Sequence, residues 1–162
     1  IREAALKHPL SKEATAETML CLMFAARFDH IDKLVIPNLE KDKVVITDRF
    51  DASSFAYQIY AQEAKQIESL FWKLREYLSR LPDIYIYFDV DAKEGIRRAK
   101  NRNLKNTIEA NHFDEKEIDF HNRLRVGYKE FFKKVPHVII DSNRPLEEVK
   151  KDFFKVFDGL IK

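Results

Sequence analysis

Glycine and cysteine are scarce in this sequence. Its 162 residues include three glycines and one cysteine. None of the glycines, Gly95, Gly127 and Gly159, belongs to the G-x-x-x-x-G-K-[S/T] pattern of a phosphate-binding loop. The single cysteine, Cys21, excludes an internal disulfide and a cysteine-based metal cluster, and it fits a reducing compartment. The sequence therefore contains no phosphate loop of this type, and the cytoplasm is the expected location.

Long apolar runs and a strong charge bias are also absent. The longest apolar run, Met19 to Ala26, has eight residues, far below the roughly 18 needed to cross a membrane. Lysine and arginine number 29 against 27 aspartates and glutamates, so the net charge is +2. A near-neutral chain has no general attraction to polyanions. We therefore expect no membrane segment and no nucleic-acid partner, in a chain with the length of one domain.

Three short apolar runs predict buried strands. They are "KVVIT" (43–47), "DIYIYFDV" (83–90) and "HVIID" (137–141), and each is rich in β-branched or aromatic residues. Long segments with helical periodicity separate them, as crossover helices between parallel strands require. The sequence therefore predicts an α/β domain with a parallel sheet flanked by helices.

Helices are predicted between and after these strands. Their boundaries follow from apolar periodicity and from the prolines near their ends. The predicted ranges are 13–38, 51–80 as one broken helix or two consecutive helices, 92–103, 115–134 and 146–161. The asparagine-rich segment "NRNLKNTIEAN" (101–111) is instead expected to be an exposed, mobile loop.

Asp48 and Arg49 directly follow the first predicted strand. Open parallel sheets bind ligands at the carboxyl ends of their strands. An arginine at that edge can hold a phosphate by two charged hydrogen bonds, and an aspartate can hold a hydrated Mg²⁺. A second interpretation is that Asp48 caps the next helix while Arg49 forms a surface ion pair. The dipeptide alone does not decide between them.

Arg27 lies within an apolar stripe of the first predicted helix. The stripe consists of Leu20, Met23, Phe24, Ile31 and Leu34. Burying an unpaired guanidinium costs on the order of several kcal/mol. Arg27 is therefore expected to meet either an acidic residue of the protein or a polar ligand.

A basic series occurs in "EGIRRAKNRN" (94–103), which places Arg98, Lys100 and Arg102 at alternate positions. Cations above a phosphate site can neutralise the charge that spreads in the transition state of phosphoryl transfer. The same series also suits a solvated helix end, where basic residues complement the helix dipole. Both interpretations stay open.

Several motifs, in order along the chain, resemble the thymidylate kinase family. They are "MFAAR" (23–27) with "VIPNL" (35–39), "VITDRFDASSFAYQ" (45–58), "IYFDVDAKEGIRRAKNR" (86–102), "NHFDEKEIDFHNRLRVGY" (111–128) and "IDSNRPLEEV" (140–149). Members of this family are P-loop kinases that phosphorylate dTMP with ATP and Mg²⁺ in the synthesis of dTTP. The resemblance implies a P-loop NTPase-type parallel sheet, this activity, and a homodimer built from the segment 13–38 and the region around Trp72.

The resemblance also implies an acceptor site. Arg49 would grip the phosphate of dTMP, with Asp48 beside it near Mg²⁺ through a water molecule. Arg27 would hydrogen-bond O4 of thymine. The remaining acceptor positions would be Met23 and Phe24 beside the base, Ser53 and Ser54 approaching it, Tyr57 on the deoxyribose, and Gln58 near the base or sugar.

On the donor side, the resemblance makes 98–114 a lid. Arg98, Lys100 and Arg102 would contact ATP there, and Arg102 would act with Asp48 and Arg49 in catalysis. Asn143 and Arg144, in the loop after the third predicted strand, would line the adenine.

The sequence departs from the family pattern at three places. Met23 stands where the family stacks a phenylalanine on thymine, and Phe24 follows about 100° around the helix. In the lid, "NHFD" (111–114) replaces D-R-F-E. The family's first two strands, phosphate loop and first helix have no counterpart in 1–162. We therefore expect one incomplete domain with a gap about 10 Å wide in its sheet, since neighbouring strands lie about 4.8 Å apart.

Three alternatives to a dTMP kinase stay open at this point. One is a related deoxynucleoside monophosphate kinase with another base preference, which the residue at position 23 suggests. Another is a catalytically inactive nucleotide-binding fragment, because the phosphate loop is missing. The third is a nucleic-acid- or protein-binding module whose aromatic residues provide stacking faces.

Overall fold

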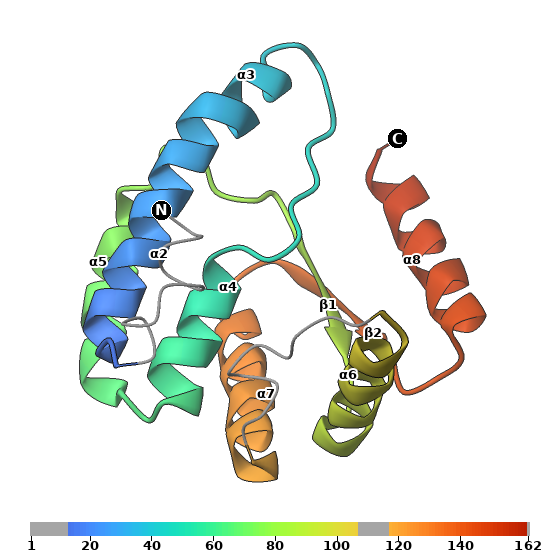
Figure 1. Ribbon diagram of the computed structural model, residues 1–162. Helices are drawn as coiled ribbons and strands as arrows, with labels where there is room; N and C mark the ends of the chain where they lie inside the picture. Colours follow the sequence, from blue (N-terminus) through green and yellow to red (C-terminus); the bar gives the residue numbers. More distant parts are fainter. Residues whose placement is uncertain (1–12, 107–116, 162) are drawn as a thin grey trace.

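The computed structural model describes residues 13–106 and 117–161. Figure 1 shows a helix-rich molecule with two central strands. In chain order the elements are α2 (Ala16–His30), η2 (Ile31–Val35), α3 (Ile36–Leu39), α4 (Asp51–Ser54), η3 (Phe55–Ala61), η4 (Lys65–Ile67), α5 (Glu68–Glu76), β1 (Tyr85–Asp89), α6 (Ala92–Asn106), α7 (Ile118–Phe132), β2 (His137–Asp141) and α8 (Leu146–Leu160).

Each predicted helical segment is confirmed. The first is continuous through α2, η2 and α3, because η2 is a π-helical stretch within it. It begins at Thr15, whose hydroxyl accepts the backbone N–H of Thr18 at 3.2 Å as an N-cap. The segment 51–80 is broken, as expected, into α4 with η3 and then η4 with α5.

Strands β1 and β2 pair in parallel, from Tyr85 opposite His137 to Asp89 opposite Asp141. This pairing across a helical crossover confirms the α/β class. Both carboxyl ends therefore carry an aspartate at the same edge of the sheet. The strands are less buried than predicted, since Phe88 is 42% exposed and Ile139 is 50% exposed.

The prediction of a strand at 43–47 was wrong. These residues form an extended connection from α3 to α4 without strand pairing (Figure 1). Val44 is 63% exposed and Ile46 is 68% exposed. A strand exists only through hydrogen bonds to a neighbour, and β1 and β2 pair only with each other among the described residues. The composition of 43–47 is thus that of a strand, but no described segment pairs with it.

The predicted loop at 101–111 was wrong in its first part. Helix α6 continues to Asn106, so 101–106 are helical. Ion pairs from Glu94 to Arg97 and Arg98, one turn apart, support the helix near its start. The remainder of the predicted loop, 107–111, lies outside the described residues.

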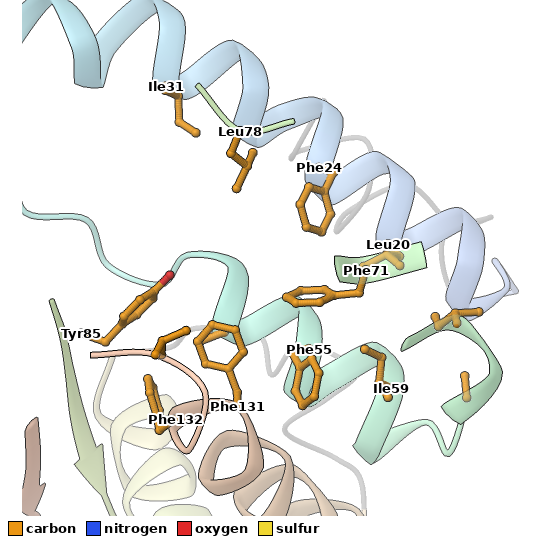
Figure 2. Packing of buried hydrophobic residues seen from close by; sticks show 14 residues of the cluster. Leu20, Phe24, Ile31, Phe55, Ile59, Phe71, Leu78, Tyr85, Phe131 and Phe132 are labelled. Atoms are coloured by element: carbon orange, nitrogen blue, oxygen red, sulfur yellow. The ribbon is translucent and has the colours of Figure 1, made fainter. Parts of the chain in front are cut away.

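The hydrophobic core lies mainly between helices. Figure 2 shows rings from α2, η3, α5 and α7 converging. Phe24, Phe55, Phe71 and Phe131 have no exposed surface. Phe71 meets Phe24 edge to face with ring centroids 5.5 Å apart, and Phe55 at 5.1 Å. Such pairs add about 0.5–1.5 kcal/mol each beyond burial. This core holds the α4–η3 segment, which carries the predicted acceptor residues Ser53, Ser54, Tyr57 and Gln58.

Helix α8 packs on the opposite side of the two strands from α2 and α5 (Figure 1). Phe153 of α8 contacts Phe88 of β1, with ring centroids 6.0 Å apart. No helix in 13–106 or 117–161 is both long enough and apolar enough to cross a membrane.

Candidate functional site

Arg27 is buried, as predicted, with 9% of its surface exposed. Its Nη2 donates to the backbone oxygen of Phe50 at 2.9 Å and to Oγ of Ser54 at 3.0 Å. The guanidinium lies 4.6 Å from the ring centroid of Phe24 and 5.1 Å from that of Phe50. Its hydrogen-bond partners are therefore neutral oxygens rather than the acidic residue that was one expectation. Nη1 is buried and has no hydrogen-bond partner among the described residues.

Burial lowers the pKa of Arg27 to about 10, against the opposing effect of the negative charge of Asp51. The group stays cationic at neutral pH. A buried cation with one unused amino group can donate a strong hydrogen bond to a ligand acceptor. Folding has already removed water from the guanidinium, so ligand binding does not have to desolvate it.

Arg49 lies in a sharp turn between the extended connection and α4. Its φ of 66° is left-handed, a conformation that costs a non-glycine residue about 1–2 kcal/mol. Its Nη1 donates to the hydroxyl of Tyr57 at 3.2 Å, and the guanidinium lies 5.4 Å from the ring centroid of Tyr57. Asp48 and Arg49 are both exposed. A strained turn that presents an exposed arginine is typical of functional sites.

A polar residue of α4 and one of η3 contact these arginines. Ser54 contacts Arg27, and Tyr57 contacts Arg49. Gln58, one turn after Ser54, is 4% exposed, and its Oε1 has no hydrogen-bond partner among the described residues. The structure therefore brings both predicted arginines into contact with the α4–η3 segment, and it leaves Nη1 of Arg27 and Oε1 of Gln58 without a hydrogen-bond partner among the described residues.

Three further acceptor positions have other surroundings. The hydroxyl groups of Ser53 and Tyr128 are 2.9 Å apart, which connects α4 to α7. Phe24 is completely buried in the core, beneath the guanidinium of Arg27. Met23 is half-buried on α2, so it is the more accessible of the two side chains.

On the donor side, Arg98 is anchored to the loop after β2. Its Nη1 donates to the backbone oxygen of Ser142 at 2.8 Å, and its Nε donates to Glu94 at 2.7 Å. Hydrogen bonds from Arg97 and Arg98 lower the pKa of Glu94 to about 2. Arg98 therefore connects α6 to the loop that carries Asn143 and Arg144.

Asn143 and Arg144 are held within that loop. Oδ1 of Asn143 accepts the backbone N–H of Asp91 at 2.9 Å, and its Nδ2 donates to Asp141 at 2.8 Å. Arg144 forms an ion pair with Asp152 and donates to the backbone oxygen of Asp141 at 3.2 Å. Lys100 and Arg102 are exposed on α6. The structure thus brings Arg98, Asn143 and Arg144 together at one loop and places the other two basic residues further along the helix.

Two polar networks near the sites were not predicted. In the first, the buried carboxylate of Asp51 accepts Nε of Arg75 at 2.7 Å and the hydroxyl of Tyr85 at 2.6 Å. The sequence signal was an aspartate at the first position of a helix. Acidic residues are common at helix starts, where they complement the helix dipole, so this one did not indicate a buried network.

The second network lies at the carboxyl edge of the sheet. Arg125 of α7 donates to both oxygens of Asp89, at 2.7 and 2.9 Å, and also pairs with Asp91. Lys129 reaches Asp89 at 3.1 Å. Burial acts to raise the pKa of Asp89, but hydrogen bonds from Arg125 and Lys129 outweigh it and leave that pKa below its ordinary value. The i, i+4 spacing of Arg125 and Lys129 was the available signal.

The family model described as thymidylate kinase matches residues 1–153. The chain belongs to the thymidylate kinase family. Thymidylate kinase of Onion yellows phytoplasma (strain OY-M) is 36% identical over 148 residues, which cover 89% of this chain and 69% of the relative. Thymidylate kinase of Nitrosospira multiformis is 36% identical over 147 residues, covering 86% and 67%. Thymidylate kinase of Anoxybacillus flavithermus is 33% identical over 161 residues, covering 98% and 76%.

Membership of the thymidylate kinase family confirms two predictions. The helix-rich architecture with a parallel strand pair is consistent with the P-loop NTPase-type α/β fold of that family. The family is one of nucleoside monophosphate kinases, so the predicted enzyme class is confirmed as well.

Proposed function

We propose that this chain forms the dTMP-binding part of an enzyme that converts dTMP to dTDP with ATP, a step of dTTP synthesis in the cytoplasm. One observation carries the proposal. The buried Nη1 of Arg27 and the buried Oε1 of Gln58 are unpaired among the described residues; Arg27 contacts α4 at Ser54, and Gln58 lies one turn further along, in η3. Thymine offers acceptors at its carbonyl oxygens and a donor at N3, which match an unused donor and an unused acceptor.

The phosphate of dTMP would bind at Arg49. Its exposed guanidinium can form two parallel hydrogen bonds to phosphate oxygens. Tyr57, which now accepts from Nη1 at 3.2 Å, would pack on the deoxyribose. Ser53 and Ser54 would line the base, together with Phe24 and the more accessible Met23. Arg49 would then orient the acceptor oxygen for in-line transfer, which needs positioning and charge neutralisation but no covalent intermediate.

Asp48 fits a role beside Mg²⁺. It is exposed, and its negative charge favours the neighbouring cation of Arg49. No group of three potential ligands occurs among the described residues. Mg²⁺ commonly uses one or two carboxylates with waters and substrate phosphates. Asp48 would therefore hold Mg²⁺ through water, and the ion would supply charge neutralisation at the ATP phosphates.

The donor ATP would bind near the loop after β2. Asn143 and Arg144 would line the adenine, and Arg98, which bonds to this loop at Ser142, would fix the start of the lid. Lys100 and Arg102 would approach the phosphates, with Arg102 neutralising charge in the transition state. The lid would span 98–114, of which 98–106 lie within the described residues.

The domain itself is proposed to be single and incomplete over 1–162. The exposed apolar side chains of Val44 and Ile46 support this, because a neighbouring strand would cover them and pair with the backbone of 43–47. A homodimer through 13–38 and the region of Trp72 belongs to the same proposal. Analytical ultracentrifugation tests the dimer, and a monomer at micromolar concentration would contradict it.

Calorimetric titration with dTMP tests the acceptor site first, since it does not need the phosphate loop. Arg49→Gln should weaken binding about 10- to 100-fold, because a charged hydrogen bond contributes about 1.5–3 kcal/mol. Arg80→Gln is the matched control, because Arg80 forms an exposed ion pair with Asp83 three residues away. Wild-type protein that does not bind dTMP would overturn the proposal.

Turnover with MgATP and dTMP, dUMP or dGMP then separates the alternatives. Phosphorylation with dTMP as the preferred acceptor supports the proposal. Preference for another acceptor would favour a related deoxynucleoside monophosphate kinase that selects a different base. The half-buried Met23, at the position beside the base, is the residue that suggests this alternative. Binding of dTMP without turnover would favour the inactive nucleotide-binding form. Binding to single-stranded DNA in place of dTMP would favour the binding module.

A further inference from the structure

Asp51 is the most completely buried charged residue among those described. Its exposed fraction is 0%. The carboxylate accepts three hydrogen bonds, from Nε of Arg75 at 2.7 Å, from the hydroxyl of Tyr85 at 2.6 Å and from the backbone N–H of Ala52 at 2.9 Å. A buried carboxylate with three donors is held firmly, because moving it would leave a charge and three polar groups unsatisfied.

These donors come from three separate elements. Arg75 belongs to α5, Tyr85 begins β1, and Ala52 lies in α4 beside Asp51 itself. Figure 2 shows the hydroxyl of Tyr85 beside the chain that enters α4. The guanidinium of Arg75 is itself fixed, at 5.7 Å from the ring centroid of Trp72. Asp51 therefore joins the start of α4 to both the helical core and the sheet.

The segment that Asp51 anchors is the one with the strained turn. Arg49 is left-handed at φ 66°. Helix α4 has no side-chain cap at Phe50. Strained backbone persists only where its surroundings determine it strongly. Asp51, two residues after Arg49, supplies that constraint.

Arg27 meets the chain on both sides of Asp51. It donates to the backbone oxygen of Phe50, one residue before, and to Oγ of Ser54, three residues after. Both of these hydrogen-bond partners of Arg27 are neutral. The negative charge that favours the buried Arg27 cation comes from the nearby carboxylate of Asp51. The two arginines of the candidate acceptor site thus depend on one carboxylate that contacts neither of them by a hydrogen bond.

We infer that Asp51 is a positioning residue of the acceptor site: held by Arg75 and Tyr85, it fixes the turn that presents Arg49 and keeps Arg27 aligned with Ser54. The inference rests on the proposed function, because it assigns Asp51 to the binding of dTMP. The competing interpretation is a structural ion pair, which would contribute to folding stability alone.

The test compares three variants with wild type. Asp51→Asn keeps the shape of the side chain and removes its charge. Tyr85→Phe removes only the hydroxyl that donates to Asp51, and it provides the test if Asp51→Asn does not fold. Glu68→Gln is the matched control, because Glu68 also lies on α5 and accepts two side-chain donors, Trp72 and Lys134, away from α4. Calorimetry gives the Kd for dTMP, and amide hydrogen exchange follows residues 48–54, both well below the melting temperature.

Asp51→Asn should raise the Kd for dTMP about tenfold or more and speed exchange in 48–54, while Tyr85→Phe should do so to a smaller extent. Glu68→Gln should change neither. The inference would be overturned if Asp51→Asn or Tyr85→Phe lowered the melting temperature but left the Kd for dTMP and the exchange rates of 48–54 at their wild-type values. The proposed function would not be affected by that result. Wild-type protein and Glu68→Gln that both fail to bind dTMP would overturn the proposed function and the inference with it.

Discussion

Gly127 is the point at which α7 packs most closely on η3. A Cβ atom at this position would lie 2.7 Å from Cβ of Tyr60 and 2.9 Å from Cα of Ala56. Normal contacts between carbon atoms are about 3.5–4.0 Å, and the backbone atom of Ala56 cannot move aside as a flexible side chain would. Gly127→Ala should therefore force α7 and η3 apart by roughly 0.5–1 Å.

The net effect follows from two opposing contributions. Alanine in place of glycine within a helix stabilises by about 1 kcal/mol. Overpacking costs about 1–3 kcal/mol, and contact with backbone puts Gly127 at the upper end of this range. Gly127→Ala should therefore lower the free energy of unfolding by about 1–2 kcal/mol, or the melting temperature by about 2–8 °C for a chain of this size. Because η3 carries Tyr57 and Gln58, dTMP affinity should fall as well.

Gly159→Ala is the matched control. Gly159 also lies in a helix, α8, but a Cβ there would meet no other described atom within 4 Å. This variant should gain up to about 0.5–1 kcal/mol from helix propensity alone. Urea unfolding and thermal melts of both variants give the comparison. If Gly127→Ala were stabilised as much as Gly159→Ala, the close approach of α7 and η3 would be refuted.

Three further predictions concern the core, the acceptor site and pH. Phe71→Ala should destabilise the fold by about 3–5 kcal/mol in urea unfolding, because the ring is fully buried between other aromatic rings; a loss below 1 kcal/mol would contradict its central position. Arg27→Lys keeps the charge but not the planar fork, so calorimetry should show dTMP binding weakened about tenfold, and unchanged affinity would argue against thymine recognition by Arg27. The depressed pKa of Asp89 gives stability that is complete above about pH 4, the pKa of an unfolded aspartate, and is lost as the pH falls through the lower folded value. Arg125→Gln should therefore make the free energy of unfolding fall less steeply below about pH 4 than in wild type, and equal slopes would show that Arg125 does not cause the shift.

Local patterns were sufficient to predict the helices and two strands. Periodic apolar residues and nearby prolines marked α7 and α8 within a few residues, because burial of one helical face and the loss of a backbone donor at proline are local effects. The same periodicity placed Arg27 in an apolar stripe and predicted its burial. It could not identify Ser54 as a partner, because that contact joins residues 27 positions apart.

The two main failures have one physical cause. The segment 43–47 has strand composition, yet a strand requires hydrogen bonds from a second segment, and composition does not reveal whether that segment is present. Asp51 was overlooked because its donors lie 24 and 34 residues further along the chain. Neither pairing leaves a signal within one window of the sequence.

The sequence by itself determined the helical segments, the parallel strand pair, the absence of a phosphate loop from these 162 residues, and the family motifs that carry Asp48, Arg49 and Tyr57. Only the tertiary structure decided that 43–47 is exposed, that Arg27 keeps one amino group unused beside Ser54, and that a buried Asp51 anchors the turn at Arg49. The first set depends on propensity and periodicity, which act between near neighbours. The second depends on burial and hydrogen bonds between distant segments, which exist only after the chain has folded.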